Sequence, residues 1–270
     1  MTTRPERAPA RVRVGVVGVG AIAAALVEAI LTGPRGGDVE VVLSPRSPAR
    51  ARDLGARFAS VRVADDNQAV LDSSDVVVLA VLPRQVAGVC AALRFRPDHV
   101  VASLAAGWPP TLLRDHVAPA GTVCQLIPLP MIALHAGPVV MFPEVPTVAA
   151  ALEGCGEIVV LDDESHVLVL SCASASMSTY FQLQTTLVGW AAGKGLRREV
   201  AADYVAALVQ GLAAEGAGVP ADRLDSLAVE HETPGGLNEQ VRRALTDAGL
   251  FAELTHQLDD LHRTRVAPSG

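Results

Sequence analysis

The sequence predicts an α/β protein with an N-terminal Rossmann-type doubly wound sheet and a C-terminal all-helical domain. Over residues 1–161, short β-branched runs alternate with segments of helical spacing, which is the pattern of a parallel sheet covered by helices. After residue 161 the strand-like runs stop, and Ala- and Leu-rich segments with helical spacing follow. We therefore expect two domains, at residues 1–161 and 162–270.

The first elements have the order of a βαβ unit. A β-branched run at Val12–Val17 is followed by a glycine-rich turn and a helical segment at Ala21–Leu31. A second apolar run at Val39–Leu43 comes before Ser47, which is a suitable helix cap. The helix that follows is expected at Pro48–Phe58, because the fixed φ of proline suits a first helical position.

The rest of the chain continues this pattern and then becomes helical. The other strands of the first domain are expected at Val61–Ala64, Val76–Val81, His99–Leu104, Thr122–Ile127, Val139–Phe142 and Glu157–Leu161, with helices at Gln68–Leu71, Gln85–Leu93, Pro110–Val117 and Val145–Leu152. Such largely apolar strands are typical of a sheet buried on both faces. The second domain is expected to form helices at Glu164–Ala173, Ser178–Gly193, Arg197–Glu215, Ala221–Val229, Leu237–Asp247 and Phe251–Arg263.

Composition excludes several classes of partner. Half of the 270 residues are apolar and only 3% are aromatic, so small aliphatic side chains are expected to fill the core. The formal net charge of -7 gives no basic field for nucleic acid or an anionic membrane. No apolar run reaches the roughly 18 residues of a membrane span, and no apolar stretch of signal-peptide length precedes the first strand. We expect a cytoplasmic protein without nucleic-acid or membrane partners.

The cysteines and histidines show no metal-binding pattern. The four cysteines are widely spaced, form no CxxC pair and lie in apolar stretches, where reduced and buried thiols are usual. The seven histidines show no spacing with a carboxylate that would suggest a zinc or iron site. We therefore expect no metal.

A dinucleotide fingerprint stands between the first strand and the first helix. The stretch Gly18-Val19-Gly20-Ala21-Ile22-Ala23 matches the pattern GxGxx(G/A). Gly18 would permit the tight turn, Gly20 would let the backbone approach a pyrophosphate, and Ala23 would let the helix lie close to the strand. The first helical residues, Ala21 and Ile22, would place the helix N-terminus against the negative charge.

The turn after the second strand predicts NADP(H) rather than NAD(H). Many such domains place a carboxylate there, which binds the ribose 2′-OH and would repel a 2′-phosphate. This chain has Ser44-Pro45-Arg46-Ser47 instead. Arg46 offers a planar cation, and Ser44 and Ser47 offer hydroxyl donors, all suited to a phosphate.

Four stretches of the first domain match one reductase family. They are the Gly18-Val19-Gly20 turn with its helix, Ser44-Pro45-Arg46-Ser47, Ala80-Val81-Leu82-Pro83 and Ser103-Leu104-Ala105-Ala106-Gly107, and Asn67 also fits. On these residues the chain resembles pyrroline-5-carboxylate reductase, in which the last two stretches read Ala-Val-Lys-Pro and Ser-Ile-Ala-Ala-Gly. The resemblance implies that six residues flank the adenosine or the nicotinamide, namely Asn67, Ala80, Val81, Pro83, Ala105 and Ala106. It also implies an intertwined homodimer built through the helical domain.

The substrate side of the resemblance is altered. Thr233-Pro234-Gly235-Gly236 is similar to the family's Ser/Thr-Pro-Gly-Gly loop, which holds the carboxylate of the cyclic imine, but Leu237 and Asn238 replace the threonines that follow. The family's Gly-Ser-Gly-Pro-Ala-Tyr signature aligns only loosely with residues 174–179, and its Met-Pro-Asn-Thr-Pro stretch becomes Ile-Pro-Leu-Pro-Met at 127–131. An unpaired buried polar group costs about 1 to 3 kcal/mol, so these changes predict a different substrate.

The polar residues that remain predict the substrate site. We expect Ser176, Thr233 and Asn238 to act on the substrate as the catalytic set, and Thr179, Gly235 and Gly236 to hold it. An iminium is already activated for hydride transfer, so positioning and exclusion of water suffice. The leading hypothesis is therefore an NADPH-dependent reductase of a C=N bond in a small cyclic imine.

Two other functions stay open on the sequence. A hydroxyacid-type NADP dehydrogenase acting on C=O would need Lys194 in catalysis, although a cation is favourable at a helix terminus such as Gly193-Lys194-Gly195 in any case. A non-catalytic NADP(H)-binding protein would explain the loose match at residues 174–179. His231 has a pKa suited to proton donation, or it serves as a hydrogen-bonded loop residue.

Overall fold

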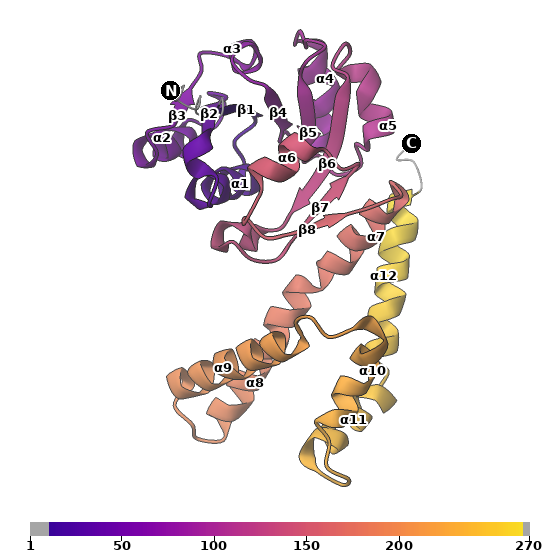
Figure 1. Cartoon of the computed structure of the whole chain (residues 1–270). Helices are drawn as coiled ribbons and strands as arrows, with labels where there is room; N and C mark the ends of the chain where they lie inside the picture. The colour runs from indigo at the N-terminus through magenta and orange to yellow at the C-terminus, as the bar shows by residue number, and fades with distance from the viewer. Residues whose placement is uncertain (1–10, 267–270) are drawn as a thin grey trace, which may run out of the picture. The chain divides into compact units, whose positions relative to one another are not determined.

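A computed structural model describes residues 11–266 of the chain (Figure 1). The expected absence of a leader concerns Met1 to Ala10, which lie outside the described residues. The structure divides into two compact units, residues 1–168 and 169–270, and each is described by itself. The dividing point falls within α7 (Ser165–Ala173), whereas the predicted domain boundary at Leu161 falls between the last strand and this helix.

The first unit contains the predicted Rossmann-type sheet. Its eight strands are β1 (Val12–Val17), β2 (Val39–Leu43), β3 (Val61–Val63), β4 (Val76–Leu79), β5 (Val100–Ser103), β6 (Thr122–Pro128), β7 (Pro138–Phe142) and β8 (Glu157–Val160). They lie in the order β3-β2-β1-β4-β5-β6-β7-β8, which begins as in a doubly wound dinucleotide-binding fold. The predicted fold class is confirmed.

One strand pair departs from the parallel pattern. β6 and β7 are antiparallel, while the other neighbouring strands are parallel. The reason is the short connection between Pro128 and Pro138, because a parallel crossover needs a dozen or more residues. The chain crosses this gap through a 3₁₀ turn at Pro130–Leu134 and returns beside β6.

Helices cover both faces of the sheet because alternate strand residues point to opposite faces. On one face, Val14, Val16, Val76 and Val78 join a buried cluster with α1 (Ala21–Thr32), α2 (Pro48–Arg57) and α6 (Pro146–Ala151). On the other face, Val17, Val77 and Leu79 join a second cluster with α3 (Asn67–Asp72), α4 (Val86–Ala91) and α5 (Pro110–Leu113). The sheet is therefore buried on both sides, as the apolar strands predict.

Several element ends differ from the predictions. β4 ends at Leu79, so Ala80 and Val81 belong to the loop that leaves the sheet rather than to the strand. Pro83 opens a 3₁₀ turn at Pro83–Gln85, and α4 begins only after it. The predicted helix at 110–117 is a four-residue α5 followed by a 3₁₀ turn at Arg114–His116. Proline supplies no amide to a strand or helix ladder, which accounts for the break at Pro83.

The described part of the second unit contains helices and no strand, as predicted. Beyond α7 these are α8 (Met177–Gly193), α9 (Arg198–Gly216), α10 (Ala221–Glu230), α11 (Leu237–Asp247) and α12 (Leu250–Val266). Its buried cluster is small and lies between α8 and α9, where Val188, Ala201 and Val205 pack together. Among the described residues, no helix is both long enough and apolar enough to cross a membrane.

Candidate cofactor and substrate sites

The glycine turn after β1 requires glycine at its first position. Gly18 has a φ of +94°, and a Cβ there would lie 2.8 Å from the carbonyl oxygen of Ala80. Its amide donates to Oγ of Ser44 at 2.9 Å, and Ser44 is fully buried. The turn is therefore fixed against β4 on one side and against the end of β2 on the other.

The N-terminus of α1 is left open above this turn. Gly20 is the N-cap residue, and it makes no side-chain capping bond because it has no side chain. A Cβ at Gly20 would meet no atom within 4 Å, so this space is open to a ligand. Ala21 and Ile22 form the first turn of the helix, while Ala23 is buried against the sheet. The geometry suits a pyrophosphate bound by helix amides.

The loops expected to bind the cofactor meet at one edge of the sheet. The parallel register pairs Val16 with Leu43, Val17 with Leu79, and Leu79 with Ser103. The residues that follow these strands therefore leave the sheet at the same carboxyl edge. In doubly wound sheets this edge holds the ligand where the strand order reverses, which here is between β1 and β4.

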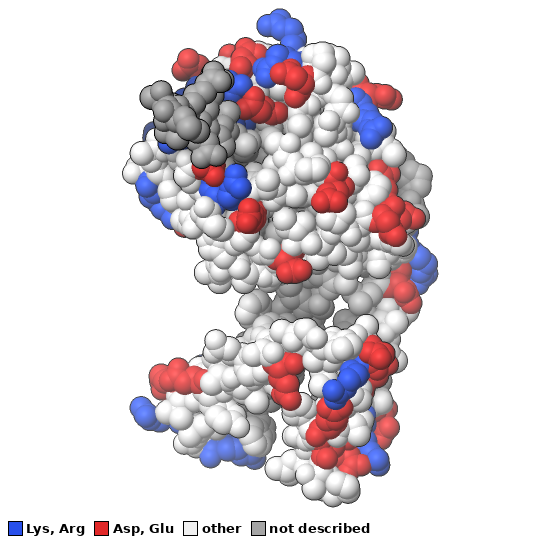
Figure 2. All heavy atoms as spheres, in the orientation of Figure 1, with Lys and Arg blue, Asp and Glu red and all other residues white. Residues whose placement is uncertain are grey.

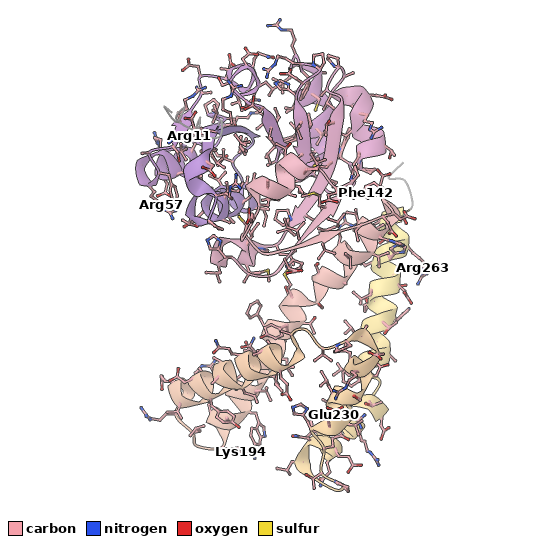
Figure 3. All side chains as sticks on the ribbon, viewed as in Figure 1. Arg11, Arg57, Phe142, Lys194, Glu230 and Arg263 are labelled. Atoms are coloured by element: carbon pink, nitrogen blue, oxygen red, sulfur yellow. The ribbon has the colours of Figure 1, made fainter. Side chains whose placement is uncertain are left out.

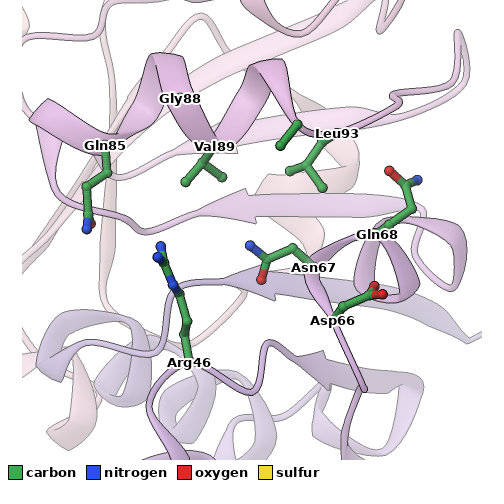
Figure 4. Close-up of a pocket in the computed structure, with 9 residues that line it drawn as sticks. Arg46, Asp66, Asn67, Gln68, Gln85, Gly88, Val89 and Leu93 are labelled. Atoms are coloured by element: carbon green, nitrogen blue, oxygen red, sulfur yellow. The ribbon is translucent and has the colours of Figure 1, made fainter.

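Arg46 and Asn67 line one pocket at this edge, with a volume of about 650 Å³ (Figure 4). Arg46 lies in the turn between β2 and α2, and Asn67 is the first residue of α3. The side chains of Arg46 and Asn67 both point into this space (Figure 4). Asn67 is held in place because Oδ1 of Asp66, the N-cap residue, accepts a hydrogen bond from the Ala69 amide at 2.8 Å. The structure thus brings together two residues predicted to bind the cofactor.

The opposite wall of the pocket was missed in the sequence. It comes from α4 and the residues directly before and after it, through Gln85, Gly88, Val89, Ala92 and Leu93, and Asp66 and Gln68 complete the lining. Gly88 and Ala92 are exposed and four residues apart, so they lie on the same helix face, where their small size leaves room for the pocket. This pair of small residues is the signal that could have indicated a ligand face on α4.

Ser44 does not occupy the place that the prediction gave it. Its side chain is fully buried and receives the Gly18 amide, so it holds the glycine turn rather than offering a hydroxyl to a phosphate. Ser47 is half-buried as the N-cap residue of α2 and makes no capping bond with its side chain. Of the two predicted hydroxyl donors, Ser47 is the one placed beside Arg46 at a helix N-terminus.

The other predicted cofactor residues follow β4 and β5. Ala80 and Val81 are half-buried, and Pro83 and Ala106 are exposed at the loop surface. Ala105 is only 2% exposed, and its backbone is held by Oγ of Ser103 and by the Gln125 side chain at 3.2 and 3.4 Å. Ala105 therefore shapes the loop, while Ala106 and Pro83 present the accessible surface.

The predicted substrate loop lies between α10 and α11 in the helical unit. Its turn is closed by the Gly236 amide, which donates to the carbonyl oxygen of Thr233 at 2.6 Å. Gly235 has a φ of +72°, and its amide donates to Oε2 of Glu239 at 2.6 Å. Asn238 donates through Nδ2 to the carbonyl oxygen of His231 at 2.9 Å. Several polar groups of this loop thus form hydrogen bonds with the loop itself or with the helix ends beside it.

The other two predicted substrate residues lie at the start of α8. Ser176 donates through Oγ to the carbonyl oxygen of Ala173 at 2.8 Å, which is a bond within its own turn. Thr179 is exposed one turn later on the same helix.

His231 is held at both ring nitrogens. Nδ1 faces the carbonyl oxygen of Leu227 at 2.8 Å, and Nε2 faces Oε2 of Glu215 at 3.0 Å. Both partners are acceptors, and these two contacts raise the pKa of His231 above its ordinary value. The structure favours the interpretation of His231 as a hydrogen-bonded loop residue.

Lys194 ends α8 and is exposed (Figure 3). Gly195 follows it with a φ of +95°, which is the usual geometry of a helix C-terminus. Within the described part of the chain, no group of three or more His, Cys, Asp or Glu side chains could hold a metal ion.

The chain matches the family described as NADP oxidoreductase, coenzyme F420-dependent, over residues 13–107. Every residue predicted to bind the cofactor lies within this segment. The pyrroline-5-carboxylate reductase of Pseudomonas aeruginosa is 28% identical over 207 residues, which cover 70% of this chain and 72% of that protein. The chain is thus similar in sequence to a pyrroline-5-carboxylate reductase. The resemblance predicted from its motifs is confirmed.

Solved structures agree on the fold of the chain. The enzyme of Streptococcus pyogenes matches with a TM-score of 0.77 at 19% identity, covering 94% of this chain and 97% of that one. A pyrroline carboxylate reductase of Plasmodium falciparum with NADP bound matches with a TM-score of 0.79 at 15% identity, with the same coverage. An imine reductase of Streptomyces aurantiacus matches with a TM-score of 0.55 at 21% identity, covering 93% of both chains. The predicted reductase class and NADP(H) cofactor agree with these relatives.

Proposed function

We propose that the chain is an NADPH-dependent reductase of the C=N bond of a small cyclic imine. The observation that carries the proposal is the arrangement of three features at the carboxyl edge of the sheet. There, the glycine turn lies below the open N-terminus of α1, next to the pocket lined by Arg46 and Asn67. The relatedness to pyrroline-5-carboxylate reductases supports the reaction class.

NADP(H) fits the residues at this edge. The space that a Cβ at Gly20 would fill is open beside the amides of the first turn of α1, as a pyrophosphate requires. Arg46 and Ser47 would hold the 2′-phosphate, and Asn67 would bind the adenosine. When bound, NADPH supplies the hydride, and the protein supplies binding and orientation.

The described side chains fit imine reduction better than alcohol oxidation. Oxidation of an alcohol needs a general base, but both ring nitrogens of His231 already have partners within the helical unit, and Lys194 is exposed at the end of α8. An iminium carbon accepts a hydride without such a base, provided that it is positioned and shielded from water. We propose that Ser176, Thr179, Thr233 and Asn238, with Gly235 and Gly236, position the substrate.

The substrate of this loop is proposed to lack a carboxylate. Glu239 already occupies the Gly235 amide, and Glu239 is paired with Arg243 at 2.7 Å. A substrate carboxylate would have to displace this internal carboxylate or lie beside it, and two adjacent negative charges repel each other. A neutral or cationic cyclic imine meets no such cost.

The helical unit is proposed to form a homodimer. Many large apolar side chains of this unit are exposed, among them Phe181, Tyr204 and Leu237 at 63%, 67% and 82%. Figure 2 likewise shows broad uncharged areas on the drawn face of these helices. Apolar surface on this scale is characteristic of an interface.

A cytoplasmic location is also proposed. The four cysteines are all buried as free thiols, and such thiols suit a reducing compartment.

The test is oxidation of NADPH by the purified protein, followed by loss of its absorbance. The panel contains pyrroline-5-carboxylate, cyclic imines without a carboxylate, and 2-oxo acids, each with NADPH and with NADH. We expect turnover of a carboxylate-free imine with NADPH, and an Arg46→Ala variant that loses about tenfold or more in NADPH affinity but not in NADH affinity. Arg114→Ala, an exposed arginine on the other half of the sheet, is the matched control. Turnover of 2-oxo acids alone, or NADPH binding without any turnover, would contradict the proposal.

A further inference from the structure

Trp108 joins two loops that leave neighbouring strands. Its indole Nε1 donates to the carbonyl oxygen of Pro83 at 2.9 Å, although the two residues are 25 positions apart in the chain. Pro83 belongs to the loop after β4, and Trp108 ends the loop after β5. The indole is thus a crosslink between the two segments that contain Ala80, Val81, Ala105 and Ala106.

The indole itself is fixed by its surroundings. Trp108 is half-buried and packs against the buried cluster on one face of the sheet. Its ring meets the ring of His116 edge-on, with centroids 5.0 Å apart and an angle of 76° between the planes. The preceding Gly107 has a φ of +74°, which turns the chain so that residue 108 points back toward β4. A fixed donor of this kind also fixes its acceptor, the Pro83 carbonyl.

The two loops follow β4 and β5, in the half of the sheet where doubly wound folds bind the nicotinamide nucleotide. The register pairs Leu79 with Ser103, and the Leu104 amide donates to the carbonyl oxygen of Leu79 at 2.9 Å at the end of this ladder. Beyond that point the strands diverge into loops. In a doubly wound fold, the half formed by β1 to β3 holds the adenosine part and the half beginning at β4 holds the other nucleotide. The crosslink made by Trp108 therefore lies at the nicotinamide end.

We propose that Trp108 is a positioning residue that sets the separation of these two loops around the nicotinamide ring. The proposal rests on the NADP(H) site of the proposed function, but not on the identity of the imine. Trp108 acts through Pro83 and the loop backbone, so its effect is confined to the nicotinamide half. Arg46 and Asn67 follow β2 and β3, and α4, which forms the opposite wall of their pocket, is held separately because Val86 and Cys90 are buried against the sheet. This pocket therefore keeps its affinity for the adenosine part.

The test compares two ligands on a Trp108→Phe variant, which keeps an aromatic ring but removes the N–H donor. NADPH probes both halves of the site, and 2′,5′-ADP probes the adenosine half alone. We expect NADPH to bind about three- to tenfold more weakly, because the two loops are no longer held together and must be ordered when the nicotinamide binds. We expect the affinity for 2′,5′-ADP to stay within about twofold, and the fluorescence gain of bound NADPH to decrease, because the nicotinamide is less confined. Trp190→Phe, a 66% exposed tryptophan in α8, is the control for loss of an indole and should leave both ligands unaffected.

Two results would overturn the proposal. Unchanged NADPH affinity and fluorescence in Trp108→Phe would show that the crosslink does not reach the nicotinamide. Equal weakening of NADPH and 2′,5′-ADP would show a general loss of the fold instead of a local effect. Neither readout depends on turnover, so failure of every imine in the panel would refute the proposed reaction and leave this test intact.

Discussion

The two units of the chain differ in how completely each buries its own apolar residues. In the first unit, two large clusters fill both faces of the sheet, and strands, helices and loops all contribute to them. In the described part of the second unit, only Cys172, Val188, Ala201 and Val205 are buried, while large apolar side chains are exposed along α8 to α12. The first unit thus buries its apolar core by itself, whereas the second unit by itself leaves most of its large apolar side chains exposed.

This difference separates two kinds of functional residue. At the carboxyl edge of the sheet, the residues proposed to bind the cofactor are held by contacts within their own unit, such as the bond from the Gly18 amide to Ser44. In the helical unit, Thr233 lies on an exposed loop and Leu237 begins α11, beside apolar side chains that the unit itself leaves exposed. A cofactor site of this chain should therefore survive changes that abolish a substrate site.

The largest expected effect is on self-association through the exposed apolar side chains of the helical unit. The double variant Phe181→Asp/Tyr204→Asp should weaken the proposed dimer by about a thousandfold or more, because burying an unpaired charge costs several kcal/mol. Light scattering across a concentration series would measure the shift to monomer. Leu134→Asp is the matched control, since Leu134 is a 78% exposed apolar residue of the first unit. A wild-type protein that is monomeric at all concentrations would contradict the inference that a second copy of the chain covers these apolar side chains.

A pair of glycine variants tests the first unit at its most constrained point. Gly18→Ala should lower NADPH affinity by about a hundredfold and also lower the unfolding temperature, because a left-handed conformation is strained for alanine and its Cβ would contact the Ala80 carbonyl. Gly20→Ala should lower the affinity by about tenfold with no change in the unfolding temperature. Its Cβ would contact no atom of the protein but would enter the space proposed for the pyrophosphate. Calorimetric titration and thermal unfolding would measure both. The result against this interpretation is an equal loss of stability in the two variants.

The smallest expected effect is a pH dependence of stability in the first unit. His99 is 1% exposed, accepts the Arg96 amide at Nδ1 and faces the Leu71 carbonyl through Nε2, so its proton lies on Nε2. Burial, followed by the charge of Arg96, lowers the pKa of His99 below its ordinary value. The unfolded chain therefore binds a proton that the folded chain does not, and stability decreases as the pH falls below about 6.5.

This effect has a defined upper limit. The free energy of unfolding should decrease by at most about 1.4 kcal/mol for each pH unit in this range. Urea unfolding at about pH 7.5 and about pH 5.5 would measure it, and a His99→Asn variant should show a smaller decrease. A wild-type protein that is more stable at the lower pH would show that another group dominates.

Most of the first unit could be predicted from the sequence because its signals are local. The strands are short apolar runs, and the turn at Gly18 and the helix start at Pro48 follow from backbone chemistry that belongs to single residues. The NADP(H) site follows from the same signals, since the residues after each parallel strand must meet at one edge. What local signals could not give is the role of Ser44, because a serine in a turn does not reveal which side of the chain its hydroxyl faces.

The missed residues of the site depend on tertiary contacts. Gly88 and Ala92 line the pocket only because α4 lies across from Arg46, and this depends on the order of the strands. Trp108 was likewise missed, because its partner Pro83 is distant in the chain. In the helical unit, the spacing predicts each helix, but periodicity alone does not say which apolar faces remain exposed. The role of Thr233 and Asn238 therefore remains a prediction.

The bond between Gly18 and Ser44 has a consequence for redesign of the cofactor preference. A common route to an NADH-dependent enzyme is to replace the whole turn after the second strand, including the residues that bind the 2′-phosphate. In this chain such a swap would also remove the hydroxyl that holds the glycine turn at 2.9 Å. Engineering should therefore change Arg46 and Ser47 and keep Ser44, so that the pyrophosphate cradle stays intact while the choice of nucleotide changes.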